Sequence, residues 1–301
     1  MPPIPHDFFP SDPDIDTVYA EQIEAEIKSE LQSLYPEKLD PEFRVFSSIR
    51  YDPDAYRQVE LWSATPLDTP ILLLARNFLF IKEHYTRLIF SLRYFEHQFP
   101  QSNDNEQVQL SYAEFLEKLN IAMAPHDPEQ IYRLRASLSL TGELTVEVFA
   151  TPPVADLFWG LDATTEPLWD VYLDPVQIAV SLFTLFKTNR RGHYTEARNR
   201  CLPGLKPEEE VLLWNGQDMV MEGSITNIAI FFEGRWVTPP LSLGCLCGVT
   251  RHWLLRQKLI EERPISVSDI ELGQTILLFN AVRGVMKGKV VLRPELDVPQ
   301  W

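Results

Sequence analysis

An apolar run that ends in a lysine is the feature that most restricts how this chain can fold. Residues Val176 to Phe186 are mainly apolar, Lys187 follows them, and a polar stretch containing Gly192 comes next. A lysine at the mouth of an apolar wall loses part of its hydration, which lowers its pKa and makes the amine a usable nucleophile or base. A lysine that forms a Schiff base needs this property. The plain alternative is a solvated lysine at the end of an element.

Composition argues against several classes of protein. The 301 residues carry a net charge of −16, which disfavours nonspecific binding of nucleic acids and of anionic membranes. The three cysteines, Cys201, Cys245 and Cys247, are few enough for a reducing compartment and lack zinc-site spacing, so no metal is predicted. The first residues lack the regions of a signal peptide, and no stretch has the length of a membrane span. We therefore expect a soluble, cytoplasmic protein that binds a small molecule.

The first half of the chain has the patterns of a small α/β domain, which we assign to residues 1–152. Apolar residues at helical spacing predict helices at residues 16–34, 81–99 and 111–123. Ser111 and Glu114 have the spacing of a capping box at the start of the third helix. Strand patterns occur at residues 43–51, 57–63 and 69–80, and in a hairpin of 132–140 with 144–150.

The second half, residues 153–301, is predicted to be a larger domain rich in hairpins. Pro152 and Pro153 mark the break, and residues 157–173 are predicted to be an irregular connection. Helices are predicted at 194–200, 250–260 and 266–272. Strands are predicted at 210–214, 219–222, 227–232, 236–238, 275–279 and 290–292.

Five short motifs stand in a specific order along the second half. They are Lys187, Glu222-Gly223-Ser224-Ile225-Thr226-Asn227, Thr238-Pro239-Pro240, Gly248-Val249-Thr250-Arg251 and Asn280-Ala281-Val282-Arg283-Gly284. Each motif alone is weak, but their order resembles the fold-type-IV pyridoxal-phosphate enzymes, which include class IV aminotransferases and aminodeoxychorismate lyases. His84, Arg87 and Leu88 are similar to the first-domain signature of that family. The resemblance covers roughly residues 43 to 290, whereas residues 1–40 lack the family's usual opening strands.

The resemblance implies a fold and an assembly. It predicts a smaller amino-terminal α/β domain and a larger carboxy-terminal domain with a β-barrel-like sheet core, with pyridoxal 5'-phosphate held between them. It also implies a homodimer, since family members build the active site at a subunit interface. The apolar stretch Leu157–Trp169 is a candidate for that contact, and packing within one chain is its alternative.

The same resemblance assigns roles toward the cofactor. Lys187 is the catalytic residue that forms the Schiff base, Tyr194 matches the tyrosine that contacts the phenolic oxygen, and Glu222 matches the carboxylate that keeps the ring nitrogen protonated. Asn227 matches an asparagine that braces this region. Phosphate contacts are expected from Arg87, Val249, Thr250, Asn280 and Ala281, because a helix start and an arginine both favour an anion. Each residue also has a plain alternative, such as a solvated strand-end glutamate or a simple helix cap.

Four residues are candidates for binding substrate. Ser48 and Arg50 are two apart on a predicted strand and so share a face. Arg191 and Arg283 match positions where lyase-like members of the family carry basic residues. Several arginines beside the cofactor suggest a substrate with more than one carboxylate, although each arginine could instead pair with one of the 43 acidic residues.

Three functions remain open from the sequence. The first is an aminodeoxychorismate lyase, which yields 4-aminobenzoate and pyruvate for folate synthesis. The second is a class IV aminotransferase that acts on branched-chain amino acids, D-amino acids or (R)-amines. The third is a protein that binds the cofactor without turnover, and the presence of both Lys187 and Glu222 argues against it.

Overall fold

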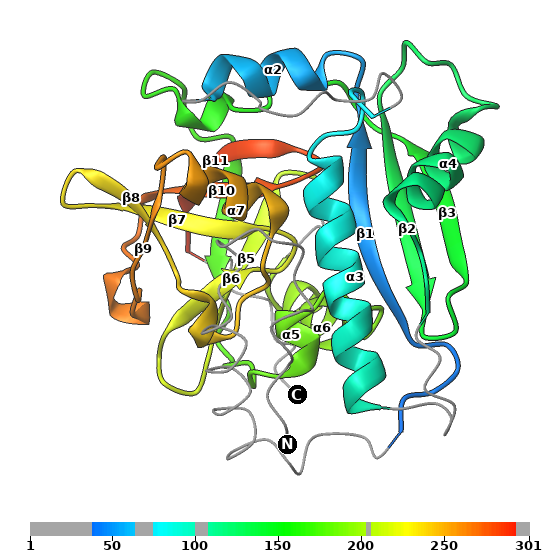
Figure 1. Ribbon diagram of the computed structural model, residues 1–301. Helices are drawn as coiled ribbons and strands as arrows, with labels where there is room; N and C mark the ends of the chain where they lie inside the picture. The colour runs from blue at the N-terminus through cyan, green and yellow to red at the C-terminus, as the bar shows by residue number, and fades with distance from the viewer. Residues whose placement is uncertain (1–37, 64–74, 100–107, 203–205, 293–301) are drawn as a thin grey trace, which may run out of the picture.

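The computed structural model describes residues 38–63, 75–99, 108–202 and 206–292, which form two β-sheets surrounded by helices (Figure 1). The smaller sheet has three strands in the order β1-β2-β3, and the larger has eight in the order β6-β5-β4-β11-β10-β7-β8-β9. The predicted boundary at 152/153 falls after β3, the last strand of the smaller sheet. The predicted mixed α/β architecture, with the larger sheet in the second half, is confirmed.

The smaller sheet is antiparallel and buries one of its faces under two helices. Its elements are β1 (Arg44–Tyr51), α3 (Ile81–Gln98), α4 (Tyr112–Met123), β2 (Tyr132–Ser139) and β3 (Leu144–Ala150). Val45 and Ile49 of β1 pair with Leu138 and Leu134 of β2, and all four share a core cluster with residues of α3 and α4. Because side chains alternate along a strand, Phe46 and Ser48 of β1 point to the opposite face. The predicted capping box of Ser111 at the start of α4 is confirmed.

The larger sheet mixes parallel and antiparallel pairs. Its strands are β4 (Trp169–Leu173), β5 (Glu209–Trp214), β6 (Val220–Gly223), β7 (Asn227–Phe232), β8 (Arg235–Thr238), β9 (Glu261–Glu262), β10 (Thr275–Asn280) and β11 (Gly284–Val290). Strand β4 runs parallel to both of its neighbours, β5 and β11. Helix α6 (Gly192–Cys201) contacts β5, and α7 (Val249–Arg256) contacts β10. No helix in the described part of the chain has the length and apolar character that crossing a membrane would need.

The segment that carries Lys187 joins the two sheets. The apolar run before it contains the short helix α5 (Leu182–Leu185), whose leucines pack into the core of the smaller sheet. The carbonyl of Lys187 accepts a hydrogen bond from the Phe46 amide at 2.9 Å, and Thr188 forms an isolated antiparallel bridge with Val45. Because β2 occupies the other edge of β1, these contacts place Lys187 on the free edge of β1.

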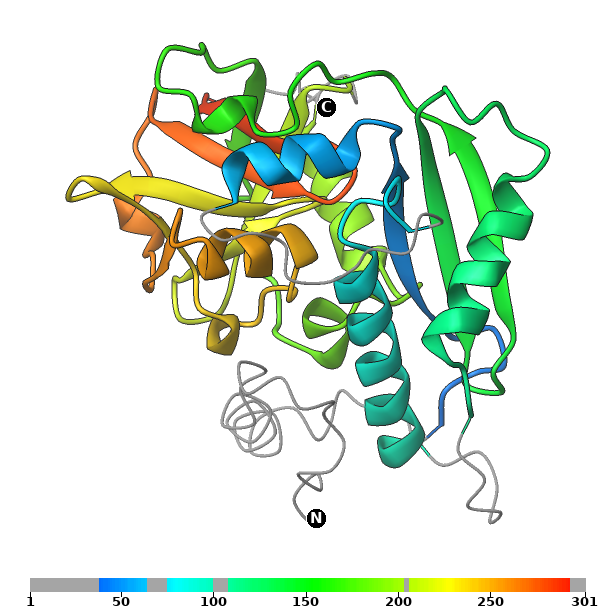
Figure 2. The ribbon, with the colours of Figure 1, turned by 45° about the horizontal axis from the view of Figure 1, so that its top comes forward.

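The strand predicted at residues 57–63 is wrong, because residues 57–62 belong to helix α2 (Ala55–Trp62). Helix α2 follows β1 and lies against the larger sheet (Figure 2). Ala55 and Val59 are one helical turn apart and pack in one cluster with Phe158, a partner that local sequence does not reveal. Of the strand predicted at 69–80, the described residues 75–80 form turns with a single bridge at Phe78. Residues 64–74 and the helix predicted at 16–34 lie outside the described residues.

Two predictions for the larger sheet are also wrong. Residues 157–173, predicted as a connection, contain β4, a strand between β5 and β11. The last strand is Gly284–Val290 rather than 290–292. A Cβ at Gly288 would lie 2.4 Å from Val171 Cγ2, so glycine permits the close approach of β4 and interrupts the strand pattern. Other predicted elements of this half are present with displaced ends, except that residues 266–272 keep only one 3₁₀ turn, Val267–Asp269.

Candidate active site

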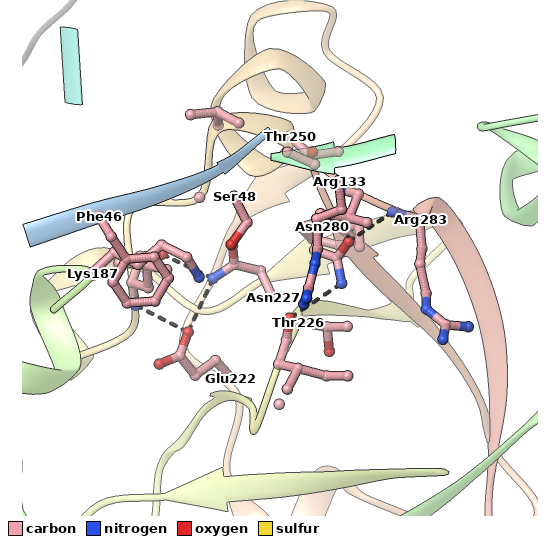
Figure 3. Close-up of a pocket in the computed structure, with 18 of the residues that line it drawn as sticks. Phe46, Ser48, Arg133, Lys187, Glu222, Thr226, Asn227, Thr250, Asn280 and Arg283 are labelled. Atoms are coloured by element: carbon pink, nitrogen blue, oxygen red, sulfur yellow. Dashed lines mark hydrogen bonds between the residues drawn. The ribbon is translucent and has the colours of Figure 1, made fainter. Parts of the chain in front are cut away.

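A cavity of about 430 Å³ lies between the outward face of the smaller sheet and the loops of the larger sheet (Figure 3). One wall comes from Phe46 and Ser48 of β1 and from residues of β2. Every predicted site residue except Arg50 lines this cavity: Ser48, Arg87, Lys187, Arg191, Tyr194, Glu222, Asn227, Val249, Thr250, Asn280, Ala281 and Arg283. The tertiary structure therefore brings together residues that span more than 230 positions of the sequence.

Lys187 is half-buried, and its Nζ lies 5.1 Å from the centroid of the Phe46 ring. Burial lowers the pKa of Lys187 well below its ordinary value, and the positive charges of Arg191 and Arg87 lower it further. The negative charge of Glu222 acts in the opposite direction but is a smaller effect. A lysine with such a pKa has a larger fraction of neutral amine at neutral pH, which is the form that attacks a carbonyl or removes a proton.

Glu222, at the end of β6, is a buried carboxyl with three donors around it. The Tyr194 hydroxyl donates to Oε1 at 2.5 Å, while the Leu246 amide and Asn227 Nδ2 donate to Oε2 at 3.1 and 3.4 Å. Burial raises the pKa of Glu222 to about 7, although the hydrogen bonds from Tyr194 and Leu246 act to lower it. Burial and the neighbouring Glu222 raise the pKa of Tyr194 well above its ordinary value, so its phenol remains a donor.

Asn227 braces the loop that precedes α7. Besides its contact with Glu222, its Nδ2 donates to the carbonyl of Leu246 at 2.9 Å. A Cβ at Gly248 would lie 2.0 Å from Asn227 Oδ1, so glycine is required for this close packing. Asn227 therefore ties Glu222 to the start of α7, as a bracing residue would.

The start of α7, together with Arg87, can receive an anion. The N-cap residue Gly248 has no side chain to satisfy the first amides of the helix. The buried Thr250 Oγ1 and Arg87 Nε have no hydrogen-bond partner within the described residues. The terminal nitrogens of Arg87 donate to Ser47 Oγ at 2.9 Å and to the Cys247 carbonyl at 3.3 Å, which fixes the guanidinium. Burial lowers the pKa of Arg87 to about 10, so this side chain stays charged at neutral pH.

Asn280 connects two loops of the cavity wall. Its Nδ2 donates to the Ile225 carbonyl at 3.2 Å, and its Oδ1 accepts from the amides of Val282 at 2.9 Å and Arg283 at 2.8 Å. Ala281, the next residue, also lines the cavity and is buried. Asn280 therefore orders the turn between β10 and β11, and its predicted contact with a phosphate stays a prediction.

The structure does not bring Arg50 into the cavity. Its guanidinium is buried, with Nε donating to Asp52 Oδ2 at 2.8 Å and Nη1 to the Val282 carbonyl at 2.9 Å. Alternation along β1 does put Arg50 on the same face as Ser48. The carboxylate of Asp52 competes for the guanidinium, however, and holds it in a buried ion pair.

Arg191 and Arg283 both line the cavity but differ in orientation. Arg191 Nη2 donates to the Ser224 carbonyl at 3.0 Å, and its Cζ lies 4.1 Å from the centroid of the Tyr194 ring. The Cζ of Arg283 lies 5.1 Å from the centroid of the Trp169 ring, and its guanidinium points away from Lys187 (Figure 3). Arg191 is thus held beside Tyr194, and Arg283 stands farther out along the cavity wall.

Sequence reasoning missed a cationic and aromatic wall on the smaller sheet. Arg135 lies over the ring of Phe46 and Arg133 over the ring of Phe149, each at 4.5 Å from the ring centroid, and all four residues line the cavity. A signal was present, because Arg133 and Arg135 are two apart on a predicted strand and so share a face. Arg135 is the cross-strand partner of Ser48.

The donors and acceptors of this cavity fit pyridoxal phosphate. Lys187 offers an amine for attachment, and Glu222 offers a carboxyl for the ring nitrogen. The test is the pair of buried atoms without partners, Thr250 Oγ1 and Arg87 Nε, since buried polar groups are almost always hydrogen-bonded. A phosphate between them would satisfy both. Within the described ranges, no group of histidine, cysteine and acidic side chains could hold a metal ion.

The fold and the site combine a lysine of lowered pKa with a helix start that can receive an anion. The family model of amino-transferase class IV matches residues 70–291. The chain therefore belongs to the class IV aminotransferase family, whose members are pyridoxal-phosphate enzymes of fold type IV.

Individual relatives agree with this family. The aminodeoxychorismate lyase of Saccharomyces cerevisiae is 32% identical, over 71% of this chain and 68% of that protein. A solved structure from Mesorhizobium loti, provisionally assigned as an amino-acid aminotransferase, has a TM-score of 0.62 and 25% identity and covers 83% of this chain and 100% of that one. The 4-amino-4-deoxychorismate lyase of Pseudomonas aeruginosa has a TM-score of 0.54 at 16% identity, over 82% of this chain and 83% of that one, and shares the fold.

Proposed function

We propose that this protein is a pyridoxal-phosphate-dependent aminodeoxychorismate lyase, which converts 4-amino-4-deoxychorismate to 4-aminobenzoate and pyruvate. The aminodeoxychorismate lyase of Saccharomyces cerevisiae supports this reaction. So does a protein of Schizosaccharomyces pombe that is provisionally assigned the same activity and is 32% identical over 54% of this chain and 68% of that protein. The cytoplasm is the compartment we propose for it, as the acidic, cysteine-poor composition favours.

One observation carries the choice of substrate: positive charge is concentrated in the cavity of an acidic chain. Among the described residues that line it, five are arginines and one is a lysine, whereas Glu222 is the sole carboxylate. With Arg87 and Thr250 assigned to the cofactor phosphate, four arginines remain for other anions. A substrate with two carboxylates accounts for this excess better than an amino acid with a single carboxylate does.

The roles of individual side chains are part of the same proposal. Pyridoxal phosphate, when bound, supplies an electron sink for the carbon that bears the substrate amine. Lys187, with its lowered pKa, removes the proton from that carbon. Ser48 donates a hydrogen bond to the enolpyruvyl oxygen as its bond to the ring breaks, while arginines of the cavity hold the two carboxylates. Loss of pyruvate leaves an aromatic ring, so the reaction needs no added keto acid.

The test is to incubate the purified protein with 4-amino-4-deoxychorismate and to measure both products. We expect 4-aminobenzoate and pyruvate to appear in equal amounts without any keto acid acceptor. Turnover that depends strictly on 2-oxoglutarate would instead establish an aminotransferase. If the protein shows the absorbance band of bound cofactor but neither lyase nor aminotransferase activity, it binds the cofactor without turnover.

Substitution of Arg283 by leucine is expected to weaken use of the dicarboxylate substrate more than it weakens cofactor binding. Loss of one hydrogen bond to a charged group costs about 1.5–3 kcal/mol, so KM should rise about 10- to 100-fold. The matched control is Arg263→Leu, which removes another arginine stacked on an aromatic ring, that of Phe232. A loss of cofactor rather than of substrate affinity would reassign Arg283 to a structural contact with Trp169.

A homodimer is part of this proposal. Of the stretch Leu157–Trp169 suggested as its contact, Leu157, Phe158 and Trp169 are buried within one chain, and Leu168 remains 67% exposed. The cavity-lining residues Arg133 and Phe149 of the smaller sheet are exposed, as expected where a second subunit would close the cavity. Light scattering at micromolar concentration should give twice the mass of the chain. A monomer with full activity would contradict the dimer.

A further inference from the structure

A second buried carboxylate lies behind the cavity, outside its lining residues. Glu210 of β5 is fully buried, and five donors converge on it. Its Oε1 accepts from the amides of Val211 at 2.8 Å and Ser224 at 2.9 Å and from the Ser224 hydroxyl at 2.5 Å. Its Oε2 accepts from the Thr226 hydroxyl at 2.8 Å and the Ile225 amide at 3.2 Å. Four of these five donors belong to one loop.

That loop, residues 223–226 between Glu222 and Asn227, holds other cavity residues through its carbonyls. The carbonyl of Ser224 accepts from Arg191 Nη2 at 3.0 Å, and the carbonyl of Ile225 accepts from Asn280 Nδ2 at 3.2 Å. Asn280 Oδ1 in turn accepts a hydrogen bond from the amide of Arg283. The position of the loop therefore determines where Arg191 and the turn that carries Arg283 lie.

The loop is closely packed against Glu210 at Gly223. A Cβ at Gly223 would lie 2.8 Å from the Glu210 carboxyl carbon and 2.4 Å from Thr226 Oγ1. Arg198 balances part of the charge, with its Nη1 3.7 Å from Glu210 Oε1 and donating to Ser224 Oγ at 2.9 Å. A buried carboxylate is tolerated only when its oxygens are hydrogen-bonded, so the loop and Glu210 stabilise each other.

We propose that Glu210 is the positioning residue for the substrate side of the cavity. It fixes loop 223–226 so that Arg191 and Asn280 are held in place, and it thereby sets the affinity for acidic substrates. Glu210 does not line the cavity. Its side-chain hydrogen bonds are with Val211 and the loop, not with Glu222, Tyr194 or Lys187. The choice of a dicarboxylate as ligand rests on the proposed function, whereas the role of Glu210 in ordering the loop does not.

The experiment compares Glu210→Gln with Glu209→Gln in the holoenzyme. Glu209 is also buried on β5, but it accepts from the Lys206 amide and makes no described hydrogen bond to the loop. In Glu210→Gln an NH₂ group replaces one carboxylate oxygen and faces N–H or O–H donors. The hydrogen bonds to that oxygen are lost, so the loop is held less firmly. We expect the dissociation constant of maleate, used as a dicarboxylate probe, and the KM for 4-amino-4-deoxychorismate to rise about tenfold. Cofactor content should stay as in wild type, and Glu209→Gln should leave maleate binding unchanged.

Several results would overturn the proposal. Equal weakening of maleate binding in both variants, or loss of cofactor from Glu210→Gln with unchanged maleate affinity, would assign Glu210 a general structural role. If Glu210→Gln does not fold, Thr226→Val removes a single donor to Oε2; a rise in the maleate dissociation constant supports the proposal and no rise refutes it. Maleate binding needs no turnover, so these results decide the role of Glu210 even if the lyase reaction is absent.

Discussion

Lys187→Ala should abolish turnover and the covalent capture of the cofactor. Proton transfer by a positioned side chain alone contributes about 10²- to 10⁴-fold, and this variant also removes the attachment point, so the loss should reach at least about a thousandfold. The partial burial of Lys187 and its lowered pKa are the physical basis of this expectation. The measurement is reduction of the wild-type holoenzyme with borohydride, followed by peptide mapping and by the same treatment of the variant.

The matched control for this experiment is Lys289→Ala. Lys289 is exposed on β11 and does not line the cavity, so its removal should change neither turnover nor the mapped adduct. An adduct that maps to another lysine, or one that persists in Lys187→Ala, would show that Lys187 is not the attachment point.

Glu222→Gln should retain the cofactor but turn over much more slowly. A neutral amide cannot stabilise a positive charge on the ring nitrogen, and loss of one charge-assisted contact costs about 1.5–3 kcal/mol, or about 10- to 100-fold in rate. The loss will be larger if the electron sink itself fails. The measurement is kcat together with the absorbance of bound cofactor.

Tyr194→Phe tests whether turnover depends on the charge of the Glu222 carboxyl or on its hydrogen bond to Tyr194. It removes the 2.5 Å hydrogen bond to Glu222 while leaving the carboxyl in place. Because Tyr194→Phe also removes the hydroxyl predicted to contact the cofactor's phenolic oxygen, a smaller loss of kcat in Tyr194→Phe than in Glu222→Gln would assign the effect to the charge of Glu222. Unchanged activity in Glu222→Gln would exclude the proposed contact with the ring nitrogen.

The smaller sheet and its helices could be predicted from local patterns because their signals are short-range. Alternation gave β1 and the hairpin of β2 with β3, and the capping box marked the start of α4. Helix α2 and strand β4 were missed for the opposite reason. Each acquires its form by packing on distant parts of the larger sheet, and no residue within a few positions indicates that partner.

The candidate site shows the same division. The order of motifs was enough to select Lys187, Glu222, Arg87 and Thr250, and the structure places all four around one cavity. Spacing along β1 correctly put Arg50 on the face of Ser48, but it could not show that the guanidinium pairs with Asp52. The spacing of residues along a strand shows which face a side chain is on. Whether that side chain enters the cavity or pairs with a nearby carboxylate depends on the tertiary structure.

The sequence by itself determined the class of chemistry, since a lysine after an apolar run and the motifs behind it favour one family. Only the tertiary structure showed that Arg133 and Arg135 join the predicted arginines in the cavity. Arg133 and Arg135 enter the cavity because β2 pairs with β1 in the register that sets Arg135 opposite Ser48. Glu210 reaches loop 223–226 because β5 and β6 are paired and the loop folds back over the buried carboxylate. Register and loop closure depend on contacts between distant segments, and a linear pattern of residues carries no record of those contacts.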